Sequence, residues 1–396
     1  MLSLKIPRNQ LFTLLLFFII TGLLLFGMGF SKFQVVGSLY LHDLLLLLVT
    51  FGSLLHFKRY FRFPYLLPIV FLSFLYLGYS LLICPQNVGF IFRQFAFFLY
   101  FTCSYLIFNK VADSTPIETF IRFVIWIAKA SVLLQLGFHA YHFSQGNFNL
   151  LDDYNYFSPL TVMGIIVFAA YILVYYRDGL NKYLLFGFTL ALSLTLGHSS
   201  AFLAVFVLFF VLLLIRVSRT AKIIILSATV LAMVALVIFI PQFTDVNSIW
   251  RLKYWAYALN IVFTENFGLL GQGFHHPYAS QAFGYELYNQ LNSVLFIDKV
   301  KPDMRYLSPF HNSFISLFFH IGFLPGLLLF VPYLKIVKYV RHRNRYYDKD
   351  TEFLILALTG ISVWVSLNVI LELPHAALFV WLVYFTLSEK WKKMSL

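Results

Sequence analysis

The chain has 396 residues, of which 61% are hydrophobic and only 11% are charged, and its mean hydropathy is +0.82. A soluble protein needs more polar side chains than this to cover its surface, so the composition excludes a soluble globular fold and favours an all-α, polytopic membrane protein. The formal charge of +13 does not indicate nucleic-acid binding, because the basic residues fall in short clusters between apolar runs.

The first apolar run, residues 11–30, follows Lys5 and Arg8, so a secretory signal peptide has to be considered. The apolar core is too long for a signal peptide and no small-x-small cleavage site follows it, so we expect a retained first span. Runs of about 20 largely apolar residues, the length that crosses a bilayer, predict twelve spans along the chain. They cover residues 11–30, 35–55, 64–83, 88–108, 119–141, 158–176, 183–197, 201–215, 223–240, 312–334, 353–371 and 375–388.

The distribution of lysine and arginine predicts the orientation of these spans. Most of the 29 basic residues fall in alternate connections, on the same side as Lys5 and Arg8 and the C-terminal Lys390, Lys392 and Lys393. Cytoplasmic loops carry an excess of basic residues. We therefore expect both termini in the cytoplasm.

One connection is much longer than the others. It runs from Pro241 to Pro309 on the outer side and is rich in Tyr, Asn, Gln and Gly. Long loops in compact proteins usually carry function. The chain is thus expected to comprise spans one to nine (1–240), a large external loop with the catalytic residues (241–311), and spans ten to twelve with a basic tail (312–396).

The external loop begins with a predicted helix that carries Arg251. Trp250, Tyr254 and Tyr257 recur in it at helical spacing. Arg251 has two interpretations. It is an arginine that snorkels at the level of the lipid headgroups, or it is an anion clamp, because a guanidinium offers fork-shaped donors that match phosphate oxygens.

Three further segments place polar groups at the outer surface. Arg93 lies within the fourth span, where a charge implies a partner or an anionic ligand unless it snorkels to the nearby surface. His198 lies in "LTLGHSSAFLA", whose serines also suit a helix cap. Asn155 lies in "LLDDYNYFSP" ahead of the sixth span, where helix capping competes with sugar binding.

His311 and Asn312 stand where the external loop enters the tenth span. The simplest interpretation is an interfacial histidine with Asn312 or Ser313 capping the helix. Lys301 and Arg305 lie a short way upstream, so several cations converge with one imidazole. This combination suits an anionic, lipid-linked substrate and a proton acceptor.

The histidines expected on the outer side do not indicate a metal site. They show no HExxH spacing, the chain has no CxxC, and the tandem His275 and His276 cannot easily chelate one ion in a regular element. We expect neither a metal nor a cofactor.

Three patches together resemble the O-antigen polymerase and O-antigen ligase family of bacterial inner membranes. "HNSFISLFFHIGFLPGLLLF" resembles the family's histidine motif at the start of the tenth span, and "WRLKYWAYALNIVFTENFGLLGQGF" resembles its arginine helix with a following G-x-G turn. "LTLGHSSAFLA" resembles the segment that opens the eighth span. These patches cover the second half of the chain, and the layout of twelve spans with a large loop after the ninth extends the likeness to the whole.

The resemblance implies a glycosyltransferase with its active site facing the periplasm. It would join undecaprenyl-pyrophosphate-linked oligosaccharide repeats into O-antigen or a related surface polysaccharide, with inversion and without a metal. The alternative within the family is a ligase that transfers finished polymer to lipid A-core. His311 falls on the family's catalytic histidine and Arg251 on its loop arginine.

The resemblance also implies a location and partners. The chain would be a multi-pass protein of the bacterial inner (cytoplasmic) membrane, in contact with membrane lipid, a chain-length regulator and a flippase, and not with nucleic acid. One departure matters, because many members have Ser-Arg where this chain has His198 and Ser199, and that arginine helps to hold the lipid phosphate. The candidates left to bind pyrophosphate or glycan are Arg93, His198, Arg305, Lys301, Asn312 and Asn155.

A twelve-span transporter or a flippase for lipid-linked sugars is the alternative outside the enzymes. Transporters of the commonest kind consist of two six-span halves with internal repeats. Here the connection between spans six and seven, from Arg177 to Lys182, is short, and the halves show no repeat. A flippase is expected to line a central cavity with basic groups. The basic groups of the candidate site in this chain cluster instead at the external loop.

Overall fold

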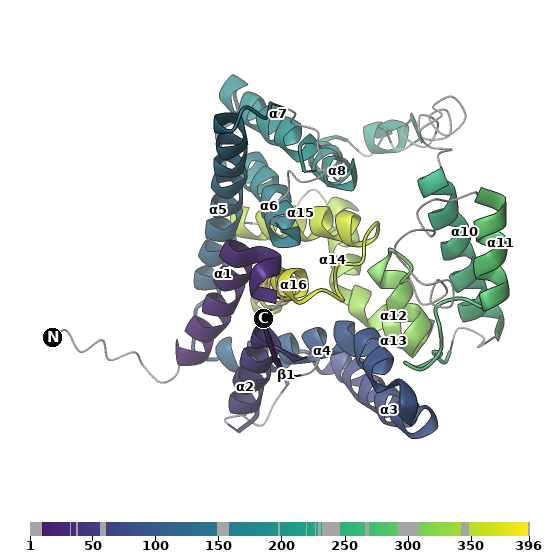
Figure 1. The fold of residues 1–396 in the computed structure, drawn as a ribbon. Helices are drawn as coiled ribbons and strands as arrows, with labels where there is room; N and C mark the ends of the chain where they lie inside the picture. Colours follow the sequence, from purple (N-terminus) through teal and green to yellow (C-terminus); the bar gives the residue numbers. More distant parts are fainter. Residues whose placement is uncertain are drawn as a thin grey trace.

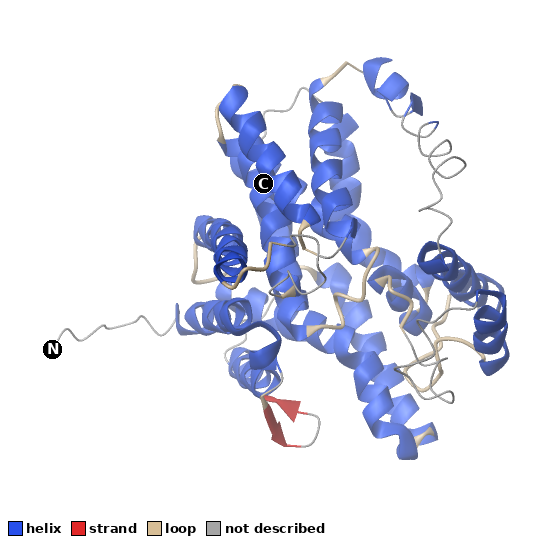
Figure 2. Cartoon of the chain, turned by 45° about the horizontal axis from the view of Figure 1, so that its top comes forward, coloured by secondary structure: helices blue, strands red, loops and turns tan. Residues whose placement is uncertain are grey.

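The structure, a computed structural model, describes residues 10–31, 33–36, 39–55, 61–148, 158–196, 199–218, 220–225, 227–228, 231, 246–265, 269–291, 309–341 and 348–394. Helices dominate these ranges, and one short hairpin is the exception (Figure 1, Figure 2). The predicted helical fold class is confirmed.

The N-terminal part of the chain forms α1, a hairpin and three further helices. The elements are α1 (Leu11–Ser31), β1 (Gln34–Val36), β2 (Leu39–Tyr40), α2 (Leu41–Leu55), η2 (Pro64–Leu66), α3 (Leu67–Ile83), η3 (Pro85–Asn87) and α4 (Val88–Val111). The second predicted span was placed too early, because an antiparallel hairpin occupies its first residues and pairs Gln34 with Tyr40. The helix begins only at Leu41, where Asp43 in its first turn accepts a hydrogen bond from the Tyr40 N–H at 3.3 Å.

The middle and the C-terminal end of the chain supply the helices of the core. These are α5 (Ile117–Ser144), α6 (Pro159–Tyr175), α7 (Leu180–Leu194), α8 (Ser199–Arg216), α15 (Lys349–Val365) and α16 (Pro374–Met394). α6 begins at a proline preceded by Ser158, whose hydroxyl accepts from the Thr161 N–H. α15 begins after Asp348, whose carboxylate accepts from the Thr351 N–H at 2.7 Å.

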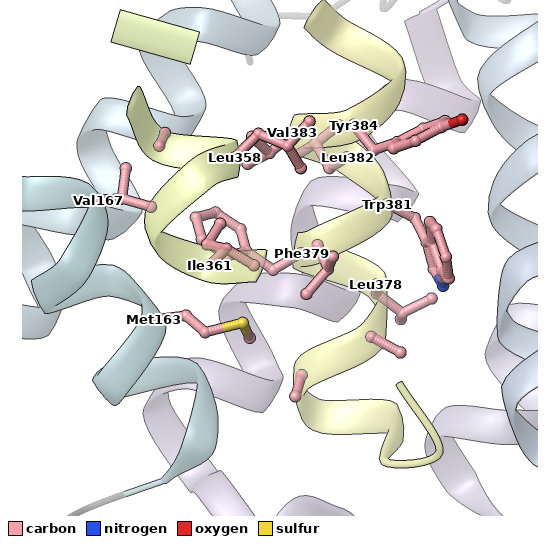
Figure 3. Close-up of a cluster of buried hydrophobic side chains, with 14 of the residues drawn as sticks. Met163, Val167, Leu358, Ile361, Leu378, Phe379, Trp381, Leu382, Val383 and Tyr384 are labelled. Atoms are coloured by element: carbon pink, nitrogen blue, oxygen red, sulfur yellow. The ribbon is translucent and has the colours of Figure 1, made fainter. Parts of the chain in front are cut away.

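The core lies where α6, α15 and α16 meet. Met163 and Val167 of α6 lie beside Leu358 and Ile361 of α15, and Phe379 belongs to the same buried cluster (Figure 3). Small residues permit the close approach of neighbouring helices. A Cβ atom at Gly164 of α6 would lie 1.9 Å from the Ser131 hydroxyl of α5, so these two helices can pack at this distance only with glycine there.

Three helices among the described residues are long and apolar enough to cross a bilayer, namely Pro64–Ile83, Pro85–Val111 and Phe323–Arg341. Large apolar side chains on several helices are exposed, including Phe18, Phe71 and Leu82 at 64%, 68% and 84%. This apolar surface suits membrane association. The count of twelve spans and their orientation stay predictions, and most of the ninth predicted span, 223–240, lies outside the described residues.

The tenth predicted span, 312–334, is not one continuous helix. It consists of α12 (Ser313–Ile321), α13 (Phe323–Leu327), η9 (Leu328–Phe330) and the start of α14 (Val331–Arg341). Gly322, with φ of 93°, ends α12 and turns the chain. The external loop contributes α10 (Val246–Asn260), the π-helix η6 (Ile261–Glu265) and α11 (Gln281–Leu291).

Candidate functional site

The helices of the external loop pack against the start of the broken tenth span. α10 and α11 lie side by side at one edge of the molecule, next to α12 and α13 (Figure 1). Buried side chains of the loop and of α12, most of them aromatic, form what we call the loop cluster, which includes Trp250, Tyr254, Tyr278, Phe310, Ile315 and Phe319. The predicted helical stripe of Trp250 and Tyr254 is confirmed as the buried face of α10.

Backbone hydrogen bonds hold the loop to the C-terminal end of α12. The Gln272 N–H donates to the Phe319 carbonyl at 2.8 Å, and the Gly273 N–H donates to the His320 carbonyl at 3.1 Å. These are carbonyls of the last helical turn, which have no partner within a helix. The His320 imidazole completes the junction, because its Nδ1–H donates to the Gly273 carbonyl at 2.7 Å.

Glycine makes this close junction possible. A Cβ atom at Gly271 would lie 2.0 Å from the His320 carbonyl oxygen, and one at Gly322 would lie 2.5 Å from the Leu269 carbonyl oxygen. Both neighbours are backbone atoms, which cannot rotate away as a side chain can. The glycine-rich turn after α10 is therefore required for docking of the loop.

The same loop segment also contacts the helices of the N-terminal half. The Ser80 hydroxyl of α3 accepts from the Phe274 N–H at 3.0 Å and lies 3.1 Å from Nδ1 of His275. Gln94 of α4 donates through Nε2 to the His276 carbonyl at 2.7 Å. The loop is thus attached to two separate parts of the helical bundle.

His311 occupies the last loop position before Asn312 and α12, in an unusual backbone conformation. Its φ is 52°, and it is the one non-glycine residue with positive φ in the part of the chain that the structure describes. The ring packs edge to face on the indole of Trp250, with centroids 5.3 Å apart and planes at 86°. Such backbone conformations persist where the surroundings impose them, and they concentrate at functional sites.

Arg251 lies within electrostatic range of His311 and contacts the same tryptophan. Its guanidinium carbon is 6.0 Å from the Trp250 ring centroid, and Nη1 donates to the Leu367 carbonyl beyond the end of α15 at 3.4 Å. Burial, together with the positive charge of Arg251, lowers the pKa of His311 to about 4. The half-buried guanidinium is thus held against Trp250 and the Leu367 carbonyl.

Asn312 caps α12, as one of its two interpretations predicted. Its side-chain oxygen accepts from the N–H groups of Phe314 and Ile315 at 3.0 and 3.1 Å. This cap ends the irregular backbone at His311 and fixes where the helix begins. The side-chain oxygen is committed to the cap, so the amide nitrogen of Asn312 is the group left for a ligand.

Ser313 connects α12 to the segment between α15 and α16. Its hydroxyl donates to the carboxylate of Glu372 at 2.6 Å and accepts from the N–H groups of Ile370 and Leu371, both at 3.1 Å. Burial raises the pKa of Glu372, while the hydrogen bond from Ser313 opposes the rise. The other carboxyl oxygen, Oε1, is buried and has no hydrogen-bond partner among the described residues.

Arg93 of α4 lies within electrostatic range of the same region. Burial, with the negative charge of Glu372, raises the pKa of Tyr278, whereas the positive charge of Arg93 acts to lower it. Arg93 itself is exposed. The structure therefore brings Arg93, Tyr278 and Glu372 together from three segments that are distant in the sequence.

Four predicted site residues lie outside the described residues, and the structure does not test them. They are Asn155, His198, Lys301 and Arg305. The four that are described, His311, Arg251, Arg93 and Asn312, all lie where the external loop meets the bundle.

Comparison with known proteins assigns the chain to no family. No family model matches the chain, and no curated protein is significantly similar to it.

The arrangement combines a cation, a neutral imidazole and a buried carboxyl. Trp250 contacts both Arg251 and His311 and is the residue that brings them together, although in the sequence it is one member of an ordinary helical stripe. Glu372 belongs to no motif, and its hydrogen bond with Ser313 places it beside the start of α12. Such a site can bind an anion next to a proton acceptor.

Substitution Gly271→Ala is expected to loosen the loop from α12, because the new Cβ displaces the His320 carbonyl. Two backbone hydrogen bonds of about 1 kcal/mol each are lost, so hydrogen exchange at the Gln272 and Gly273 amides should speed up by about 30-fold. Gly137→Ala on α5, where the Cβ meets nothing within 4 Å, is the matched control. Unchanged exchange in the Gly271 variant would show that this junction does not hold the loop.

Proposed function

We propose that the chain is a membrane glycosyltransferase that polymerises polyprenyl-pyrophosphate-linked oligosaccharide repeats on the outer face of the membrane. The observation that carries the proposal is the placement of both Arg251 and His311 against Trp250, with the charge of Arg251 acting on the imidazole. The resemblance to O-antigen polymerases and ligases supplies the substrate class.

Arg251 would stabilise the leaving group. As the anomeric carbon of the donor separates from the phosphate oxygen, negative charge develops on the departing pyrophosphate. A guanidinium held in a half-buried position acts on that charge with little screening, and it presents two parallel N–H donors to phosphate oxygens. Arg93, exposed near the same region, is the second cation available for the diphosphate.

His311 would take the proton of the acceptor hydroxyl as its oxygen forms the new bond to the anomeric carbon. A pKa of about 4 keeps the imidazole neutral near pH 7, so it is ready to accept a proton. Part of this lowering comes from the charge of Arg251. A bound diphosphate opposes that charge, so it raises the pKa of His311 and makes the base stronger when the substrate is present.

Substitution His311→Ala should leave single repeat units on undecaprenyl pyrophosphate in the membrane and reduce polymer formation by about 10²–10⁴-fold, the usual contribution of a general base. The measurement is the chain-length distribution of lipid-linked glycan in cells that produce equal amounts of each variant. His142→Ala, at the end of α5 and away from the site, is the control.

Polymer at the wild-type level in the His311 variant would defeat the general-base role. Deletion of the gene separates the two family chemistries. Surface glycan with one repeat on the core indicates a polymerase, whereas bare core with lipid-linked polymer retained in the membrane indicates a ligase.

The pH dependence of kcat/KM should report the link between Arg251 and His311, because this ratio follows the ionisation of the free enzyme. Protonation of His311 abolishes its function as a base, so activity is lost as the pH falls through its pKa, near 4 in the wild type. Arg251→Gln removes the cation and raises that pKa, so the acidic limb moves to higher pH, and the rate falls by about 10²–10³.

Arg251→Lys is the matched variant for this experiment. It keeps the positive charge and loses the fork of donors, so the rate falls while the acidic limb stays where it is. An acidic limb that does not move in Arg251→Gln would mean that His311 is not the titrating base.

A further inference from the structure

A cationic cavity lies near the C-terminal end of α16. It has a volume of about 200 Å³ and is lined by Arg62, Tyr65, Lys335, Ser388, Trp391 and Lys392, with apolar contacts from neighbouring residues. α16 begins two residues after Glu372 and runs for 21 residues, which is a length of about 30 Å at 1.5 Å per residue. This helix therefore separates the cavity from the candidate functional site.

Arg62 is the fixed part of the cavity wall. Its guanidinium pairs with Asp113 at 2.5 Å and with the buried carboxylate of Glu389, and it also donates to the Ala112 carbonyl at 3.1 Å. The two carboxylates more than balance its single positive charge. Arg62 thus holds the wall in place and adds no net positive charge to the cavity.

Two lysines supply the further positive groups of the cavity wall. Lys335 of α14 places its ammonium 5.7 Å from the ring centroid of Trp391, and no carboxylate lies within ion-pair distance of it among the described residues. A cation–π contact holds a lysine without neutralising it. Lys392 lines the same cavity and adds a second ammonium.

The position of the cavity indicates what kind of anion it takes. Two of the three helices that are long and apolar enough to span a bilayer contribute to it, Pro64–Ile83 through its first residues and Phe323–Arg341 through Lys335. The remaining wall is apolar and includes Phe63, Val331 and Pro332. Cations beside an apolar wall at the end of spanning helices match a lipid phosphate with its attached chains.

We propose that this cavity binds the phosphate headgroup of an anionic membrane lipid. The ammonium groups of Lys335 and Lys392 hold the phosphate, and Trp391 and the apolar wall contact the start of the acyl chains. The site is independent of the proposed glycosyl transfer, and no bond is made or broken in it.

The test uses the full-length protein in a neutral detergent and measures its thermal unfolding midpoint against added short-chain phosphatidylglycerol, phosphatidylcholine or inorganic phosphate. Phosphatidylglycerol should raise the midpoint of the wild type, and phosphatidylcholine should not. In the double variant Lys335→Gln and Lys392→Gln its affinity should fall by about 30-fold, since each basic residue near a lipid phosphate contributes about fivefold.

Two further variants distinguish the cavity from general surface charge. Lys338→Gln with Lys349→Gln removes two exposed lysines outside the cavity and should bind phosphatidylglycerol as the wild type does. Lys335→Arg with Lys392→Arg keeps both charges and should also retain binding, which controls for misfolding of the glutamine variant.

Three outcomes would overturn the proposal. The first is equal loss of affinity in the control and cavity variants, which means diffuse attraction. The second is no preference of the wild type for phosphatidylglycerol. The third is equal stabilisation by inorganic phosphate, which means that the cavity takes a free anion and not a lipid.

Discussion

The interrupted helix at Gly322 is the feature on which the candidate site depends. A helix that ends inside a membrane-associated bundle leaves carbonyl groups without partners, and in an apolar setting each such group costs several kcal/mol. Here the N–H groups of Gln272 and Gly273 satisfy the Phe319 and His320 carbonyls. The external loop is thus needed to complete α12, and α12 in turn holds the loop in place.

This mutual dependence fixes the reactive groups. The loop that returns to α12 carries α10 with it, so Trp250 and Arg251 lie beside the start of α12, where Asn312 and Ser313 anchor the chain. His311 lies between these two fixed elements and takes up a positive φ as a result. The lowered pKa of its imidazole follows from the same packing, because that packing brings burial and the charge of Arg251 together.

The two ends of α16 lie in different surroundings, one beside the candidate site and the other beside the cationic cavity. Near its N-terminal end, Glu372 accepts a hydrogen bond from Ser313 beside the candidate site. Its other carboxyl oxygen, Oε1, is buried and has no hydrogen-bond partner among the described residues. Near its C-terminal end, Trp391 and Lys392 line a cationic cavity next to two helices that are long and apolar enough to cross a bilayer. A rigid helix with a fully packed middle, which includes Trp381 and Tyr384, keeps the two ends apart (Figure 3).

The sequence was sufficient to predict the helices and a cap on α12 by Asn312 or Ser313, because these depend on local pattern. It also selected His311 and Arg251, whose roles stay predictions. It did not predict the hairpin ahead of α2 or the interruption at Gly322, since apolar runs look continuous where long-range hydrogen bonds break them. Glu372 and Trp250 were missed as site residues for a related reason. Their roles come from Ser313 and His311, which are distant in the chain.

The account requires the loop that carries Arg251 and His311 to face the outside of the cell membrane. A single cysteine in place of Gln281, exposed at the start of α11, in a chain with Cys84→Ala and Cys103→Ala tests this directly with a membrane-impermeant maleimide on intact spheroplasts. We predict labelling of Gln281→Cys before lysis, and labelling of Lys338→Cys on α14 only after lysis. Labelling of Gln281→Cys that appears only after lysis would place the loop in the cytosol and contradict the account.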